Sequence, residues 1–146
     1  MRKGFIFVAA LVCVFTFAFN STASAGDPQV YTKNELKTWD REKVASGVGV
    51  LAGKFSFSRN DAKESYVIKE IGWMTLLPGA SIGMHKHADN EDAYIIIFGE
   101  GVFTDSEGKK TTVTGGDITI ARAGDSHALE NTGQVPLFFL DIVAKR

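Results

Sequence analysis

The chain of 146 residues carries 16 Lys and Arg against 17 Asp and Glu, which gives a formal net charge of −1 at pH 7. This balance, with no long run of either sign, argues against nucleic acid or an anionic membrane as a partner. The single cysteine excludes an intramolecular disulfide, so packing, with or without a bound ion, has to stabilise the fold.

The first 25 residues have the pattern of a secretory signal peptide. Two basic residues precede an apolar run from Phe5 to Phe19, and the small residues Ala23-Ser24-Ala25 match a cleavage site. The apolar run is shorter than the roughly 20 residues that span a bilayer, so no permanent membrane anchor is expected. We therefore predict cleavage near Ala25 and a periplasmic or secreted protein with one domain, residues 26–146.

The start of this domain predicts one short helix. Thr32-Lys33-Asn34-Glu35 has the form of a capping box, in which the Thr and Glu side chains bond to the backbone of the first helical turn. The helix is expected to run toward Arg41 or Lys43. No later helix is expected, because the chain after Ser46 is rich in Val, Ile, Phe and Thr and is punctuated by glycine.

A series of short strands is predicted in the rest of the chain. Turn sequences such as Pro78-Gly79 and Gly115-Gly116 separate them. Many short strands without intervening helices indicate an all-β antiparallel sandwich or barrel. The predicted strands are Val48 to Phe57, Ser65 to Leu77, Ser81 to His87, Ala93 to Phe98, Gly101 to Thr104, Lys110 to Val113, Asp117 to Ile120, His127 to Asn131, and Leu137 to Val143.

Two of the three histidines, His85 and His87, lie one residue apart on a predicted strand. Side chains two residues apart on a strand point to the same face, so both imidazoles can bind one ion. The third, His127, begins another predicted strand, so all three histidines could serve one site. For an isolated His-x-His pair, two surface histidines at a sheet edge are the ordinary alternative.

Two adjacent acids, Glu91 and Asp92, follow the histidine pair. Their distance from His87 allows a tight turn and a return on the neighbouring strand, which would bring a carboxylate beside the imidazoles. Three imidazoles and one carboxylate suit a divalent transition metal and leave two positions open in octahedral coordination. The ligands do not select one metal among Fe, Mn, Zn, Ni and Cu.

The histidines, the acid and several glycines resemble two sequence motifs of the cupin family. The first motif matches residues 79–99 and the second matches residues 116–131, with Arg122 where the family usually has proline. The resemblance implies a double-stranded β-helix, the jelly-roll barrel, with one metal near its open end. The matching positions are Gly79, His85, His87, Asp92 and Gly99 in the first motif, and Gly116, Gly124, His127 and Asn131 in the second.

The motif leaves the acidic ligand open between Glu91 and Asp92. Glu91 fits the shorter spacing after His87 and is the commoner residue type in the family. Asp92 keeps the correct strand length up to Gly99, and loops absorb length changes more easily than paired strands do. This reasoning favours Asp92 and keeps Glu91 as the alternative.

Tyr94 and Arg122 are weaker site candidates. If Asp92 points inward, Tyr94 does too, and its hydroxyl could act on a substrate proton; a barrel residue without catalytic role is an equal alternative. Arg122 could bind a substrate carboxylate, although a solvated loop charge is the commoner role. Five aromatic residues are expected to fill the barrel interior or a subunit interface: Trp73, Phe98, Phe103, Phe138 and Phe139.

The resemblance implies a site for small molecules with two oxygen donors. Our first hypothesis is an exported metal-dependent enzyme acting on a hydroxy acid, keto acid or sugar by isomerase, lyase or decarboxylase, or dioxygenase chemistry. The alternative is a noncatalytic module that binds a metal or a small ligand, and a third reading is a barrel in which the ion only stabilises the fold. A homodimer that pairs through an outer sheet is also consistent with the family.

Overall fold

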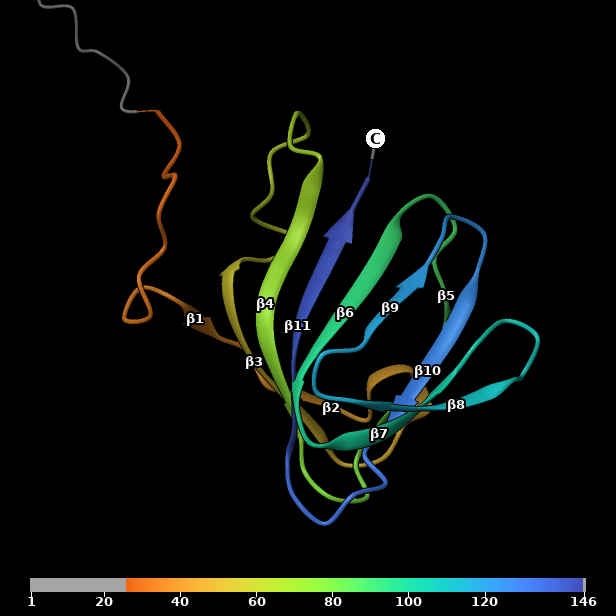
Figure 1. The fold of residues 1–146 in the computed structure, drawn as a ribbon. Coiled ribbons are helices and arrows are strands. Elements are labelled where there is room, and N and C mark those ends of the chain that lie inside the picture. Colours follow the sequence, from red (N-terminus) through yellow and green to blue (C-terminus); the bar gives the residue numbers. More distant parts are fainter. Residues whose placement is uncertain (1–25, 146) are drawn as a thin grey trace, which may run out of the picture.

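The computed structural model describes residues 26–145, so the predicted signal sequence lies outside the described residues. Within this range the chain forms a seven-stranded sheet and a four-stranded sheet (Figure 1). All neighbouring strands pair antiparallel. The predicted all-β, double-sheet architecture is confirmed.

Strands from distant parts of the sequence alternate within each sheet. The larger sheet has the order β1 (Lys37–Thr38), β3 (Val50–Phe57), β4 (Ile68–Leu76), β11 (Leu137–Ala144), β6 (Glu91–Phe98) and β9 (Ile118–Ala121), and β2 (Arg41–Glu42) also pairs with β3. The smaller sheet has the order β5 (Ser81–Lys86), β10 (Ser126–Glu130), β7 (Glu100–Thr104) and β8 (Lys110–Thr114). Each strand predicted after Ser46 is therefore present, with ends that differ by a few residues.

The predicted helix toward Arg41 or Lys43 is wrong. The Glu35 carboxylate does accept hydrogen bonds from the Thr32 backbone N–H at 2.9 Å and from its hydroxyl at 2.7 Å, as in a capping box. Only a turn follows, because β1 and β2 pair with the edge strand β3. That pairing satisfies backbone groups of an otherwise open sheet edge and outweighs the local helix signal. Among residues 26–145, no helix has the length and hydropathy needed to cross a bilayer.

A tight turn, Val44–Ser46, lies between β2 and β3 in the chain and packs against β5 of the smaller sheet. Its backbone enters the left-handed region, with φ of 51° at Ala45 and 63° at Ser46. A Cβ atom on Gly83 of β5 would lie 2.0 Å from the carbonyl oxygen of Ala45. The contact between the turn and β5 therefore requires glycine at position 83.

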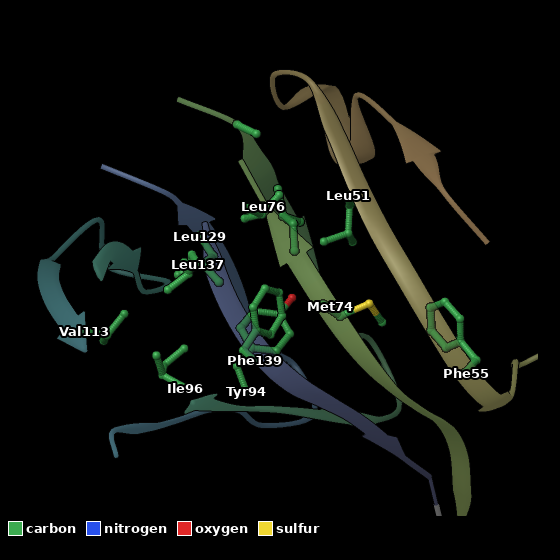
Figure 2. Packing of buried hydrophobic residues seen from close by; sticks show 12 residues of the cluster. Leu51, Phe55, Met74, Leu76, Tyr94, Ile96, Val113, Leu129, Leu137 and Phe139 are labelled. Carbon is green, nitrogen blue, oxygen red and sulfur yellow. The ribbon is translucent and has the colours of Figure 1, made fainter. Parts of the chain in front are cut away.

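The hydrophobic core lies between the sheets. Along β11 every second residue is buried, which is the alternation expected of a strand with one face toward a core. Figure 2 shows side chains of both sheets pointing into the space between them. Each fully buried large apolar side chain contributes about 1.5–3 kcal/mol to the free energy of unfolding, relative to the same side chain left exposed. The core residues labelled in Figure 2 are Leu51, Phe55, Met74, Leu76, Tyr94, Ile96, Val113, Leu129, Leu137 and Phe139.

Of the five aromatic residues predicted for the barrel interior or a subunit interface, two lie in or against the core and three lie on the outside of the larger sheet or at a strand end. Phe139 is fully buried and Phe103 packs partly buried against the core. Trp73 and Phe138 face outward from the larger sheet and stack on each other at 5.5 Å, and Phe98 is exposed at the end of β6. The interior thus has fewer of these rings than the sequence analysis allowed.

Candidate metal centre

Three imidazoles converge on one point between the sheets. His85 on β5 pairs directly with His127 on β10, and His87 follows immediately after β5. The Nε2 atom of His127 lies 3.0 Å from Nε2 of His87 and 3.1 Å from Nε2 of His85. Neutral imidazoles share at most one proton in each such contact. Three nitrogens at this spacing are therefore suited to one shared cation.

Asp92 brings a carboxylate to the same point. Its Oδ2 atom lies 3.2 Å from Nε2 of His87 and 3.4 Å from Nε2 of His127. The four candidate ligand atoms all lie within 4.8 Å of one another. The other oxygen, Oδ1, is buried and has no hydrogen-bond partner among the described residues. Three nitrogens, one carboxylate and an unsatisfied buried oxygen fit a divalent transition metal.

The outer nitrogens of two imidazoles are held by hydrogen bonds. Nδ1 of His85 lies 2.9 Å from the carbonyl oxygen of Gly83, and Nδ1 of His87 lies 2.6 Å from Oδ1 of Asn90. Both acceptors require a proton on Nδ1, so in the neutral form of each ring Nε2 keeps a free lone pair toward the shared point. Asn90 was missed in the sequence, although its place between the histidine pair and the acid was a usable signal.

Burial and the neighbouring groups prepare these side chains as ligands. Burial raises the pKa of Asp92, but hydrogen bonds from His127 and His87 hold it well below its usual range. Burial lowers the pKa of His85. Burial also lowers the pKa of His87, yet hydrogen bonds with Asp92 and Asn90 outweigh burial and raise it above its ordinary value. An ionised Asp92 and a neutral His85 are the forms that bind metal.

Glu91 and Arg122 lie away from this cluster. Nη1 of Arg122 donates to Oε2 of Glu91 at 2.8 Å, and the two side chains are 61% and 47% exposed. Because side chains alternate along β6, an inward Asp92 requires an outward Glu91. Of the two acids that the sequence left open, Asp92 therefore reaches the histidines. Arg122 is paired with Glu91 in this structure, and its binding of a substrate carboxylate stays a prediction.

Tyr94 lies on the inner face of β6, as predicted for an inward Asp92. Its side chain is buried, and its ring stacks on that of His127 with a centroid distance of 5.0 Å. Burial and the charge of Asp92 raise the pKa of Tyr94 well above its ordinary value, so the hydroxyl stays protonated. Its catalytic role remains a prediction.

A second group of charged side chains lines the barrel interior on β4 and β11. Glu70 is fully buried, and its carboxylate lies 3.5 Å from Nη1 of Arg41 and 3.4 Å from Nε of Arg59. Burial, and then the charge of Asp92, raises the pKa of Asp141 well above its usual range and so favours the neutral acid. Burial lowers the pKa of Arg59, but the charge of Glu70 and the hydrogen bond to it, with smaller contributions from Asp141 and Asp92, together outweigh burial and raise this pKa.

The sequence analysis missed this second group. Asp141 follows Phe139 by two residues, so an inward Phe139 places an acid inside the barrel. An acid at an inward strand position is a usable signal, because a buried carboxyl group requires a partner or a proton. Arg41 escaped notice because its segment was assigned to a helix.

Comparisons with known proteins agree with this geometry. The Cupin domain family matches residues 72–143. An oxalate-binding protein of Thermotoga maritima is 44% identical over 70 residues, which cover 48% of this chain and 57% of that protein. A gentisate 1,2-dioxygenase of a Ralstonia species is 32% identical over 73 residues, which cover 50% of this chain and 20% of that protein. The matched part of the chain thus spans about half of the first relative and a fifth of the second.

A solved structure extends the likeness over most of the domain. The crystal structure of a predicted oxalate decarboxylase from Thermotoga maritima matches with a TM-score of 0.71 and 31% identity. The match covers 80% of this chain and 99% of that one. Together with the cluster of three histidines and an aspartate, these relatives indicate a metal-binding site.

Proposed function

The chain belongs to the cupin superfamily, and from this premise we propose that it holds one divalent transition metal and binds a small dicarboxylate such as oxalate. His85, His87, Asp92 and His127 are the proposed ligands. The observation that carries the proposal is the convergence of three Nε2 atoms and one carboxylate oxygen within 4.8 Å.

The metal would act as a Lewis acid, with two coordination positions left for oxygen atoms of the ligand. The hydrogen bonds of His85 to Gly83 and of His87 to Asn90 keep Nε2 of both rings directed to the metal. The rings of Tyr94 and Phe103 pack on His127 at centroid distances of 5.0 and 5.4 Å. These apolar rings keep water from one side of the site.

The charges in the barrel interior favour an anionic ligand. Glu70 and Asp92 supply two carboxylates, Arg41 and the half-exposed Arg59 supply two guanidinium groups, and the raised pKa of Asp141 favours its neutral form. A divalent cation added to this balanced set leaves an excess of positive charge. A dianion such as oxalate would neutralise that excess in a site where unpaired charge is costly. The name of the 44% identical relative, an oxalate-binding protein, points to the same ligand.

Catalytic turnover of such a ligand is the second candidate function, within the wider set of isomerase, decarboxylase and dioxygenase reactions. Tyr94 supports it, because a buried hydroxyl that stays protonated beside His127 can donate a proton or hydrogen bond to a bound anion. We further propose export to the periplasm or medium on the basis of the pattern in residues 1–25.

Calorimetric titration tests the binding proposal. We expect oxalate to bind the metal-loaded protein with one site per metal and to bind the chelator-stripped protein at least about tenfold more weakly. Acetate, which has one carboxylate, is the matched control and should bind weakly in both forms. Equal oxalate binding with and without metal, or none with metal, would refute the proposal. An assay for carbon dioxide and formate from oxalate then separates turnover from binding alone.

A further inference from the structure

Two arginine side chains contact the same buried carboxylate in the barrel interior. Arg41 lies on β2, and Arg59 lies in the segment between β3 and β4. Nη1 of Arg41 is 3.5 Å from Oε1 of Glu70, and Nε of Arg59 is 3.4 Å from Oε2 of the same residue. Hydrogen bonds between charged groups of this kind are ordinarily about 2.7–2.9 Å long. Glu70 therefore holds both guanidinium groups loosely.

This group of charges has hydrogen-bonding capacity that the described residues do not use. Nε of Arg41 is buried and has no hydrogen-bond partner among residues 26–145. A guanidinium group has five N–H donors, whereas one carboxylate has only about four acceptor sites. A buried donor without an acceptor costs free energy, because water no longer satisfies it. The two arginines thus lack acceptor atoms, and a bound anion would supply them.

The arginines lie on the inner face of the larger sheet, beside the proposed metal centre. Glu70 and Asp92 are both cross-strand neighbours of Val143, so these two acids are two strands, or about 10 Å, apart in one row. Burial lowers the pKa of Arg59, and the charge of Glu70 raises it. Smaller contributions that also raise this pKa come from Asp141 and Asp92. The guanidinium group of Arg59 is therefore within electrostatic reach of a metal ligand.

We propose that Arg59 determines the ligand specificity of this site: it exchanges Glu70 for the oxygen atoms of the ligand that do not coordinate the metal. This inference rests on the proposed function, a dicarboxylate bound to the metal. Arg59 is suited to the exchange because its side chain is 47% exposed. Arg41 is only 16% exposed and is held over the rings of Trp39 and Phe55. Glu70 is then an internal competitor, which occupies Arg59 until the ligand binds.

This exchange favours a dicarboxylate over other small chelating ligands. Oxalate that chelates through one oxygen of each carboxylate keeps two free oxygens side by side. A planar guanidinium group can donate two parallel hydrogen bonds to such a pair. Glycolate that chelates through its hydroxyl and one carboxylate oxygen keeps a single free oxygen. Arg59 should therefore stabilise bound oxalate more than bound glycolate, although both ligands offer the metal two oxygens.

Calorimetric titration of the metal-loaded protein with oxalate and with glycolate tests the inference. We expect Arg59→Gln to bind oxalate at least about tenfold more weakly than the wild type, with a smaller loss for glycolate. Glu70→Gln removes the internal competitor and should bind oxalate about threefold or more tightly than the wild type. Lys110→Gln removes the same charge as Arg59→Gln at an exposed position of β8, and as the matched control it should bind like the wild type. A purely structural ion pair would leave the preference for oxalate over glycolate unchanged.

A double variant keeps the test decisive if Arg59→Gln fails to fold or to bind metal. Arg59→Gln combined with Glu70→Gln replaces the ion pair by two neutral amides, so it should keep the metal and still lose the preference for oxalate. If the metal-loaded wild type does not bind oxalate, the proposed function fails, and this inference fails with it. If the wild type binds oxalate but the single and double variants keep its preference over glycolate, the inference alone is overturned. A loss of that preference in Arg122→Gln instead would overturn it as well.

Discussion

At the residue scale, His87 is the proposed ligand whose ionisation we expect to limit metal binding. It donates through Nδ1 to Asn90 and directs Nε2 to Asp92, His127 and the shared point. Both hydrogen bonds favour the protonated ring and raise its pKa above the ordinary value of 6.5. The proton on His87 therefore competes with a metal at a pH where an ordinary histidine would already be neutral.

Metal affinity should accordingly fall as the pH drops through the raised pKa of His87. Protonated His87 stabilises the metal-free fold fully below the unfolded-state pKa of about 6.5, and this stabilisation is lost as the pH rises through the folded-state pKa. Metal binding needs the neutral ring, so affinity should decrease by about tenfold per pH unit below that pKa. Competition with a metal-sensitive dye between about pH 5.5 and 8 measures the profile, and a flat profile would contradict this role of His87.

Asp141 makes the stability of the metal-free protein depend on pH in the same direction as His87 does. Its pKa is raised by burial and by Asp92, so the folded state favours the neutral acid, and stability is lost as the pH rises from about 4 through the folded-state pKa. Asp141→Asn cannot ionise and should raise the midpoint of thermal unfolding at pH 8 by roughly 3–6 °C, with a smaller gain at pH 4. Glu130→Gln, at an exposed position, is the control. An equal gain at both pH values would mean that ionisation is not the cause.

The sequence predicted the three histidines as site residues because the chain contains no other histidine and because two of them point to the same face of one strand. It favoured Asp92 but kept Glu91 as the alternative, because spacing alone does not reveal which of two adjacent residues points inward. The pairing of β6 with β11 decides that: Asp92 lies opposite the inward Val143. Arg122 could not be placed from the sequence because its partner, Glu91, lies on β6, 31 residues earlier in the chain.

At the scale of elements, the strands were predictable and the N-terminal segment was not. Alternating apolar residues and glycine turns are local signals, so the strands from Val50 onward follow from the sequence. The capping-box signal at Thr32 is also local, and its hydrogen bonds do form. Whether a helix continues depends on the distant edge of β3, which no local signal reports.

The contact between the turn Val44–Ser46 and β5 fixes the N-terminal segment against the smaller sheet. Gly83→Ala would place a Cβ atom 2.0 Å from the Ala45 carbonyl, so the turn has to move. We expect a loss of about 1–3 kcal/mol in unfolding free energy and faster proteolysis within residues 37–47. Gly26→Ala, where nothing lies within 4 Å of the added Cβ, is the control. Equal stability of both variants would exclude a structural role for this contact.

At the scale of the whole molecule, the proposed metal centre would join the two sheets. His85, His87 and His127 belong to the smaller sheet and its continuation, whereas Asp92 belongs to the larger one. A metal bound by all four would add its binding free energy to the stability of the domain. The apolar core lies between the same sheets and does not depend on the ion.

Removal of the metal should therefore lower the thermal stability without unfolding the domain. At a free metal concentration of about 100 times Kd the loss is about 2.7 kcal/mol, or roughly 10 °C in Tm for a domain of this size. Differential scanning calorimetry with and without chelator measures it. If chelator abolished the β-sheet circular dichroism at 25 °C, the ion would be a structural requirement, and the ligand-binding role would lose its basis.

The metal content of purified wild-type protein and of two matched variants, measured by mass spectrometry after growth in metal-supplemented medium, tests the metal centre most directly. Asp92→Asn and Glu91→Gln make the same chemical change at adjacent residues, one facing the histidines and one facing Arg122. We expect about one metal per chain in the wild type and in Glu91→Gln, and at least about a tenfold loss of affinity in Asp92→Asn. A wild type without bound metal, or equal losses in the two variants, would contradict the proposed centre.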